Sequence, residues 1–229
     1  MICIPLSVAT NEEAIQSMAR CAPWADVVEL RIDAFPAPDL SVLLKNREGK
    51  ILITNRRRGE GGFFPGSEEN RCALLLEAIA LGADLVDVEL RTDREHLAHI
   101  TRAVKENHDR TELILSYHDF DGTPGMRKLQ SIVEESRRLG AHIVKIVTMA
   151  CDMKDNLRIL ELVQWADAMG QRIIGFCMGE KGRISRIAAP PFGSWMSYVA
   201  LDTAHITAPG QLTLEETRSV MEVLEKKGK

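Results

Sequence analysis

Short runs of apolar, often β-branched residues alternate along the chain with longer stretches in which apolar residues recur every three or four positions. The short runs predict strands, and the longer stretches predict amphipathic helices. Strands are expected at residues 3–8, 26–32, 51–54, 84–90, 112–116, 142–147, 172–177 and 194–201. Helices are expected at residues 11–22, 38–47, 68–81, 93–108, 125–139, 152–169, 182–188 and 213–226.

Signals for the starts and ends of helices agree with this division. Thr10 followed by Glu13 is the pattern of a capping box at the start of the first helix. Gly82, Gly140 and Gly170 each follow an expected helix, in the position where glycine commonly ends one.

The order of the elements predicts the fold class. Strands that are apolar on both faces, each followed by a helix, are typical of a parallel sheet covered by helices. Eight such units close naturally into a (β/α)₈ TIM barrel. An open doubly wound sheet is the alternative, but the segment after the first strand, PLSVATNEEA, lacks the glycines of a phosphate-binding turn. No linker or low-complexity segment divides the chain, so we predict a single α/β barrel domain over residues 1–229.

Composition excludes several function classes. With 45% hydrophobic residues, 27% charged residues and a net charge of −4, the chain has no basic excess for nucleic acid or an anionic membrane. No apolar run approaches the roughly 20 residues that span a bilayer, and the N-terminus lacks the basic region of a signal peptide. The five cysteines form no CxxC pair, so we expect reduced thiols, no metal site and a cytoplasmic protein.

One residue is unexpected inside a predicted strand. Lys145 lies in the middle of AHIVKIVTMA, although lysine is rarely buried without a partner. Its ammonium could extend out of the barrel along an apolar stem. Alternatively, desolvation and nearby arginines could lower the pKa of the amine, which could then form a Schiff base with a ketone or aldehyde. Barrel geometry alone does not choose between these interpretations.

Polar residues gather where the predicted strands end. Active sites of (β/α)₈ barrels lie at the C-terminal ends of the strands. The chain places carboxylates, arginines, a histidine and the lysine there: Glu29, Arg31, Arg56, Glu60, Asp87, Glu89, His118 and Lys145. Each has a plainer alternative; Glu29 and Arg31 could form a structural ion pair, and Asp87 and Glu89 could be polar filler of the barrel.

Six motifs then decide the interpretation. ELRID, RRRGEGG, SYHDF, VKIV, MGEKGRISR and APGQ follow one another in this order. With them the chain resembles type I 3-dehydroquinate dehydratase (3-dehydroquinase) over nearly its whole length. The resemblance implies a lyase of the shikimate pathway, which leads to chorismate and the aromatic amino acids. Such an enzyme converts 3-dehydroquinate to 3-dehydroshikimate and water through a lysine Schiff base, as a homodimer with no metal or cofactor.

The same resemblance implies roles for individual residues. Lys145 would form the imine, His118 would be the general acid and base, and Glu60 would pair with that histidine. Arg186 would bind the substrate carboxylate. The remaining substrate-binding positions would be Glu29, Arg31, Arg56, Thr207, Gln211, Met178 and Ala208. Two positions depart from the family pattern, because Thr207 stands for a serine and Tyr198 for a phenylalanine.

Two other functions compete with this one. Another class I Schiff-base lyase or aldolase would share Lys145 but prefer phosphorylated sugars, and the chain lacks a glycine-rich phosphate loop after its seventh or eighth strand. A barrel that only binds a quinate-like ligand is the second alternative. It would not need the lysine, histidine, glutamate and arginine together.

Overall fold

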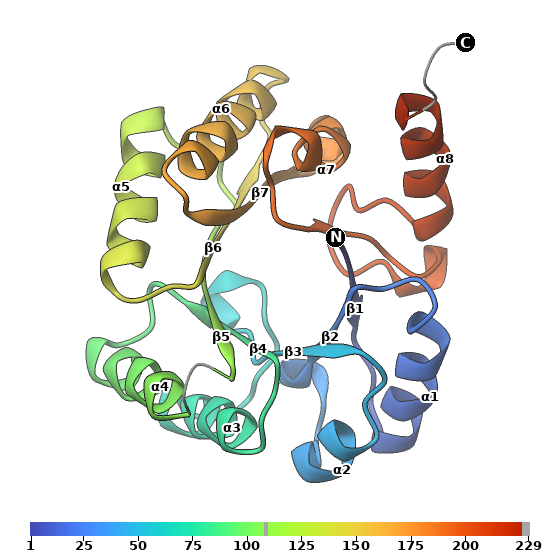
Figure 1. Cartoon of the computed structure of the whole chain (residues 1–229), viewed down its shortest axis with the longest axis vertical. Coiled ribbons are helices and arrows are strands. Elements are labelled where there is room, and N and C mark those ends of the chain that lie inside the picture. The colour runs from blue at the N-terminus through green and yellow to red at the C-terminus, as the bar shows by residue number, and fades with distance from the viewer. Residues whose placement is uncertain (108–109, 226–229) are drawn as a thin grey trace.

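The computed structural model describes residues 1–107 and 110–225, and it shows one ring of parallel strands surrounded by helices (Figure 1). The strands are β1 (Ile2–Leu6), β2 (Val27–Arg31), β3 (Lys50–Thr54), β4 (Leu85–Glu89), β5 (Glu112–Asp119), β6 (Ile143–Met149), β7 (Arg172–Met178) and β8 (Ser197–Tyr198). The helices are α1 (Asn11–Cys21), α2 (Leu40–Lys45), α3 (Glu68–Ala80), α4 (Arg94–Glu106), α5 (Met126–Arg138), α6 (Lys154–Ala168), α7 (Arg183–Ala188) and α8 (Leu214–Glu225).

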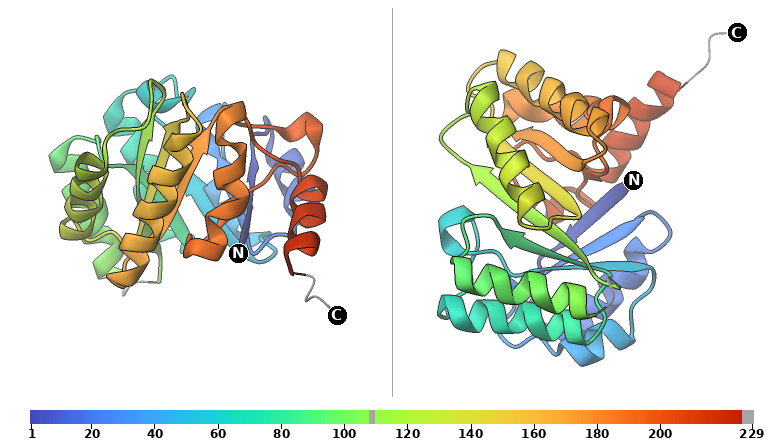
Figure 2. Two further views of the ribbon diagram at one scale, coloured as in Figure 1. Left: turned by 90° about the horizontal axis from the view of Figure 1, so that it is seen from above. Right: turned by 60° about the vertical axis from the view of Figure 1, so that its left-hand side comes forward.

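The strands are hydrogen-bonded in the order β7-β6-β5-β4-β3-β2-β1-β8, and every pair is parallel. A bridge between Ile173 and Ser194 joins β7 to the segment that leads into β8. The backbone N–H of Trp195 also donates to the carbonyl of Ile173 at 2.7 Å. These contacts close the sheet, and Figure 2 shows the tilted strands inside the helices. The prediction of a (β/α)₈ barrel is therefore confirmed.

Successive layers of side chains inside the barrel differ in polarity. Because side chains alternate along a strand, every second residue points inward. One inward layer is apolar and buried, formed by Leu52, Leu85, Ile114, Ile143 and Ile174. Two residues further along β3 to β6, the inward positions are Thr54, Asp87, Ser116 and Lys145. An apolar plug thus forms the floor of a polar site at the C-terminal ends of the strands.

The last strand differs most from expectation. Residues 194–201 were expected as one strand, but β8 contains only Ser197 and Tyr198. The backbone of Ala200 instead exchanges hydrogen bonds with Leu212 and Leu214, both at 2.8 Å. This pairing turns the chain toward the start of α8 and away from the sheet. Of the expected helices, residues 108 and 226 lie outside the described residues.

The helix boundary signals are confirmed. The Thr10 hydroxyl accepts from the backbone N–H of Glu13 at 3.1 Å. Gly82, Gly140 and Gly170 have φ values of +78°, +90° and +71°, the left-handed conformation in which a helix commonly ends.

Three structural findings concern membrane spans, cysteines and metal-binding groups. Within residues 1–107 and 110–225, no helix is both long and apolar enough to cross a bilayer. The cysteines are free thiols. The described part of the chain also holds no group of histidine, cysteine and carboxylate side chains placed to bind a metal ion.

Candidate active site

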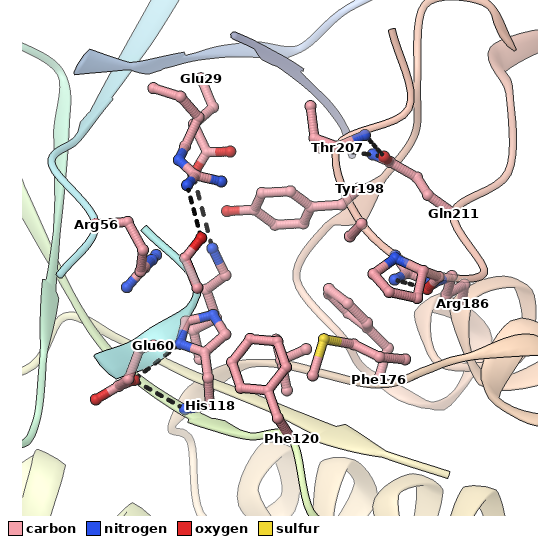
Figure 3. A pocket seen from close by; sticks show the side chains of 17 residues that line it. Glu29, Arg56, Glu60, His118, Phe120, Phe176, Arg186, Tyr198, Thr207 and Gln211 are labelled. Carbon is pink, nitrogen blue, oxygen red and sulfur yellow. Dashed lines mark hydrogen bonds and ion pairs between the residues drawn. The ribbon is translucent and has the colours of Figure 1, made fainter. Parts of the chain in front are cut away.

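A cavity of about 230 Å³ opens at the C-terminal ends of the strands and is lined by seventeen residues (Figure 3). Every residue that the motifs assign to the site lines this one cavity: Glu29, Arg31, Arg56, Glu60, His118, Lys145, Met178, Arg186, Thr207, Ala208 and Gln211. The motifs lie far apart in the sequence, and closure of the barrel brings them together.

Lys145 places its amine inside the cavity, not outside the barrel. The residue lies on β6 beside Ser116 of β5 and is 4% exposed. Its Nζ donates to Oδ2 of Asp87 at 2.9 Å and lies 3.7 Å from Oε1 of Glu29. The same nitrogen lies over the ring of Tyr198, 4.2 Å from the centroid. The charged groups that contact the amine are thus carboxylates, whereas the sequence led us to expect arginines.

Asp87 and Glu89 belong to a buried chain of alternating charges. Arg71 on α3 donates to Oε2 of Glu89 at 2.7 Å, and Arg56 donates to Oε1 of Glu89 at 2.9 Å. Arg56 also donates to Oδ2 of Asp87 at 2.7 Å, and that oxygen in turn accepts from Lys145. Burial alone would raise the pKa of Asp87, but Arg56 and Lys145 hold it far below its usual range. Asp87 therefore stays ionised beneath the amine.

Glu29 and Arg31 do not pair with each other. Arg31 makes a two-pronged ion pair with Asp33, with both N···O distances at 2.8 Å. Oε1 of Glu29 accepts from the hydroxyl of Thr54 at 2.7 Å. The ELRID motif thus carries its own arginine partner in Asp33, which the sequence analysis missed. Asp33 stands two positions after Arg31, and that spacing was available as a signal.

His118 and Glu60 form a second pair of interacting side chains in the cavity. Oε2 of Glu60 accepts from the backbone N–H of His118 at 3.0 Å and lies 3.0 Å from Nδ1 of its ring. Burial raises the pKa of Glu60 to about 7, and the nearby Glu89 adds to the effect. Burial also lowers the pKa of His118 well below its usual value, helped by Arg56 and Lys145. The contact with Glu60 occupies Nδ1 and leaves Nε2 available to a ligand.

The glycines of RRRGEGG bring Glu60 to the histidine. Glu60 ends a short 3₁₀ turn (Arg58–Glu60), after which the loop folds back onto the end of β3. A Cβ on Gly62 would lie 1.9 Å from the carbonyl oxygen of Arg56, so only glycine allows this approach.

Arg186 is a buried cation to which none of the described carboxylates is paired. It lies on α7, is 4% exposed, and donates from Nη2 to the carbonyl of Pro209 at 3.2 Å. Its guanidinium also stacks on the ring of Phe176, 4.5 Å from the centroid. In the described part of the chain its Nε has no hydrogen-bond partner, and burial lowers the pKa of Arg186 to about 10. An unpaired guanidinium at the cavity wall is suited to bind an anion.

Two loops meet at the rim beside Arg186. The N–H of Gly179 donates to the carbonyl of Pro209 at 3.1 Å. Gly210 packs so closely that a Cβ there would lie 2.2 Å from the carbonyl oxygen of Gly179. In the second loop, Oε1 of Gln211 accepts from the N–H of Thr207 at 2.8 Å and from its hydroxyl at 3.1 Å. The motifs MGEKGRISR and APGQ therefore form one wall.

Sequence reasoning missed several residues that line the cavity. These are Gly61, Phe120, Val147, Phe176, Tyr198 and Pro209. Val147 and Phe176 lie two residues from Lys145 and Met178, so strand alternation alone would have found them. Tyr198 depends on the short β8 and had no such signal.

Comparisons with known proteins agree with the geometry. The model of the family Type I 3-dehydroquinase matches residues 2–228. The chain belongs to this family. A 3-dehydroquinate dehydratase of Desulfotalea psychrophila is 38% identical over 219 residues, which cover 96% of each chain. Another, of Pyrococcus abyssi, is 38% identical over 225 residues and 98% of each chain.

A solved structure resembles this type I 3-dehydroquinase throughout its length. The 3-dehydroquinate dehydratase of Geobacillus kaustophilus superimposes with a TM-score of 0.90 at 29% identity, covering 100% of this chain and 92% of the other. The family consists of hydro-lyases of the shikimate pathway, so the chain is an enzyme of the lyase class.

Proposed function

We propose that this type I 3-dehydroquinase dehydrates 3-dehydroquinate to 3-dehydroshikimate through an imine on Lys145. The observation that carries the proposal is the guanidinium of Arg186, which has no carboxylate partner among residues 1–107 and 110–225 and lines the same cavity as the amine. A carboxylate on Arg186 and a ketone at Lys145 are the two functional groups that such a pair would hold.

Imine formation is the first step. The ammonium of Lys145 and the C3 ketone give a protonated imine and one water, and two protons move from nitrogen to the departing oxygen. The resulting iminium attracts electrons and so acidifies the adjacent C2–H. Since the iminium itself is the electron sink, this route requires no metal or cofactor.

His118 would carry out the proton transfers that follow. Nε2, the ring nitrogen that does not contact Glu60, removes the C2 proton. The electrons of the C–H bond then form the C2=C3 double bond of an enamine. The enamine then expels the C1 hydroxyl, which takes the proton from His118 and leaves as water. A second water hydrolyses the product imine and frees Lys145. Glu60 contacts Nδ1 and so fixes the orientation of the ring.

The other lining residues would hold the ring of the substrate. Glu29, Arg31, Arg56, Thr207 and Gln211 bring polar atoms to the cavity, where they could bind ring hydroxyls. Met178 and Ala208 offer apolar walls. Binding at both ends would place C2 beside His118, so that positioning lowers the barrier.

Three further properties belong to the proposal, and they rest on the cysteine pattern, the absence of a linker and the family resemblance, in that order. We propose that the protein works in the cytoplasm, that residues 1–229 form one catalytic domain, and that two copies associate as a homodimer. Light scattering of the purified protein tests the last of these, and a monomer at working concentration would contradict it.

A turnover assay tests the proposed function against the aldolase alternative. The product contains a conjugated enone, so its ultraviolet absorbance reports dehydration of 3-dehydroquinate directly. We expect turnover of 3-dehydroquinate and none of phosphorylated ketoses or aldoses. Cleavage of a sugar phosphate without dehydration of 3-dehydroquinate would contradict the proposal.

A further inference from the structure

Tyr198 extends from the closing strand of the barrel into the active-site cavity. It pairs in register with Cys3 of β1, and its side chain turns inward with 6% of the residue exposed. Figure 3 shows its hydroxyl pointing across the cavity toward the side of Glu29 and Arg56. The residue thus lies among the polar groups of the site, on a strand that supplies none of the expected site residues.

The Tyr198 hydroxyl lacks a hydrogen-bond partner among the described residues, although it is buried. The thiol of Cys3 lies next to it and is a weak acceptor, but no hydrogen bond of ordinary geometry joins them. Leaving a buried hydroxyl unpaired destabilises a folded protein, and phenylalanine would fill the same volume without that cost. A ligand atom that reaches the hydroxyl would supply the missing partner.

The ring of Tyr198 determines where that partner would lie. Nζ of Lys145 sits over the ring, 4.2 Å from its centroid. The hydroxyl projects one bond beyond that ring, so a substrate atom close to the carbon bound to Nζ would come within reach of it. Burial raises the pKa of Tyr198 well above its usual value, so the phenol stays protonated and can donate.

We propose that the Tyr198 hydroxyl donates a hydrogen bond to the substrate oxygen on the carbon that Lys145 attacks. This inference rests on the proposed function. As the N–C bond forms, the electron pair of the C=O double bond moves onto that oxygen, and the donor stabilises the developing charge. The oxygen then takes the protons that leave the nitrogen and departs as water. Tyr198 keeps its own proton throughout, so it stabilises the step without being consumed.

The test replaces Tyr198 by Phe, which keeps the ring over Lys145 and removes only the hydroxyl. Tyr117→Phe is the matched control. The Tyr117 hydroxyl accepts from Arg91 at 3.2 Å and donates to Asp119 at 3.0 Å, and Tyr117 packs in the apolar cluster that includes Leu129 and Val133 of α5. Two rates are measured, kcat for 3-dehydroquinate and the enzyme-dependent loss of an ¹⁸O label from its C3 carbonyl to water. Label loss follows imine formation whether or not elimination occurs.

We expect Tyr198→Phe to lower both rates about three- to tenfold, the change that one neutral hydrogen bond produces. The same variant should unfold at a denaturant concentration equal to or above that of the parent, since the buried hydroxyl is gone. Tyr117→Phe should leave both rates unchanged. A residue that only supports the fold would lose stability and activity together.

Two results would overturn the inference. One is a Tyr198→Phe enzyme whose kcat and label loss stay within a factor of two of the parent. The other is a clear loss of stability in that variant, which would mean that the hydroxyl is already satisfied in the free protein. Failure of the parent enzyme to dehydrate 3-dehydroquinate would instead refute the proposed function, and the inference with it.

Discussion

Replacing Glu60 by Gln is expected to stabilise the protein, and to do so more strongly as the pH rises. The carboxyl lies 3.0 Å from the imidazole of His118, and its other oxygen, Oε1, is buried without a partner in the described residues. Burial makes ionisation of Glu60 unfavourable in the folded protein. Glutamine keeps the shape and the hydrogen-bonding oxygen and removes the charge.

The size of the effect follows from the two pKa values of Glu60. In the unfolded chain the carboxyl ionises near 4.5, whereas in the folded protein its pKa is about 7. Between these values the folded state binds more protons than the unfolded state, so the free energy of unfolding falls as the pH rises. At about 1.4 kcal/mol for each pH unit, the loss is about 3 kcal/mol above pH 7 and absent below pH 4.5.

Urea unfolding at pH 4.5, 6 and 8, followed by circular dichroism and tryptophan fluorescence, measures the difference between variant and parent. That difference should grow by about 3 kcal/mol from the lowest to the highest pH. Glu68→Gln is the matched control. The pKa of Glu68 is lowered by its hydrogen bonds from Arg71, so this variant should instead become less stable than the parent as the pH rises. A difference for Glu60→Gln that is constant with pH, or that shrinks, would refute the reasoning.

Three further outcomes are expected of the site. His118→Ala should still form the imine and accumulate it, visible as a mass increase of the intact protein, and normal turnover would exclude His118 as the base. Arg186→Ala should lower kcat/KM, mainly by raising KM, because the substrate carboxylate loses its charged partner. The loss should correspond to about 2–3 kcal/mol of binding free energy, and an unchanged KM would count against that contact. In the parent, kcat/KM should rise with pH through about 7 as Glu60 ionises and holds the Nδ1 proton of His118. Glu60→Gln should flatten this rise, and a rise that persists in the variant would assign it to another group.

The fold could be predicted because its signals are local. Alternation of short apolar runs with amphipathic stretches places the strands and helices, and the strand count leads to the barrel. The length of β8 could not be predicted, because it depends on hydrogen bonds from Ala200 to Leu212 and Leu214. Those partners are more than ten residues away, and no pattern in the sequence around Ala200 predicts the pairing.

The site was partly predictable for the same reason. A lysine within an apolar strand pointed to Lys145, and strand ends pointed to the carboxylates and arginines around it. Pairing between distant segments of the site was not predictable, because those side-chain partners are set by closure of the barrel. Asp87 accepts from Lys145, and Glu89 accepts from Arg56, although in each pair the partners lie far apart in the sequence. From the sequence alone, the roles of Arg186 and Gln211 could be proposed only through the motifs, since no single feature of their sequence neighbourhood assigns them.

The most direct test of the account is to identify the residue that binds the substrate covalently. The enzyme is mixed with 3-dehydroquinate, reduced with borohydride, digested and analysed by mass spectrometry, with Lys145→Met treated in parallel. We predict one reduced adduct, on the peptide that contains Lys145, and none in the variant. An adduct on another lysine, or full turnover by the Lys145→Met enzyme, would contradict the central claim.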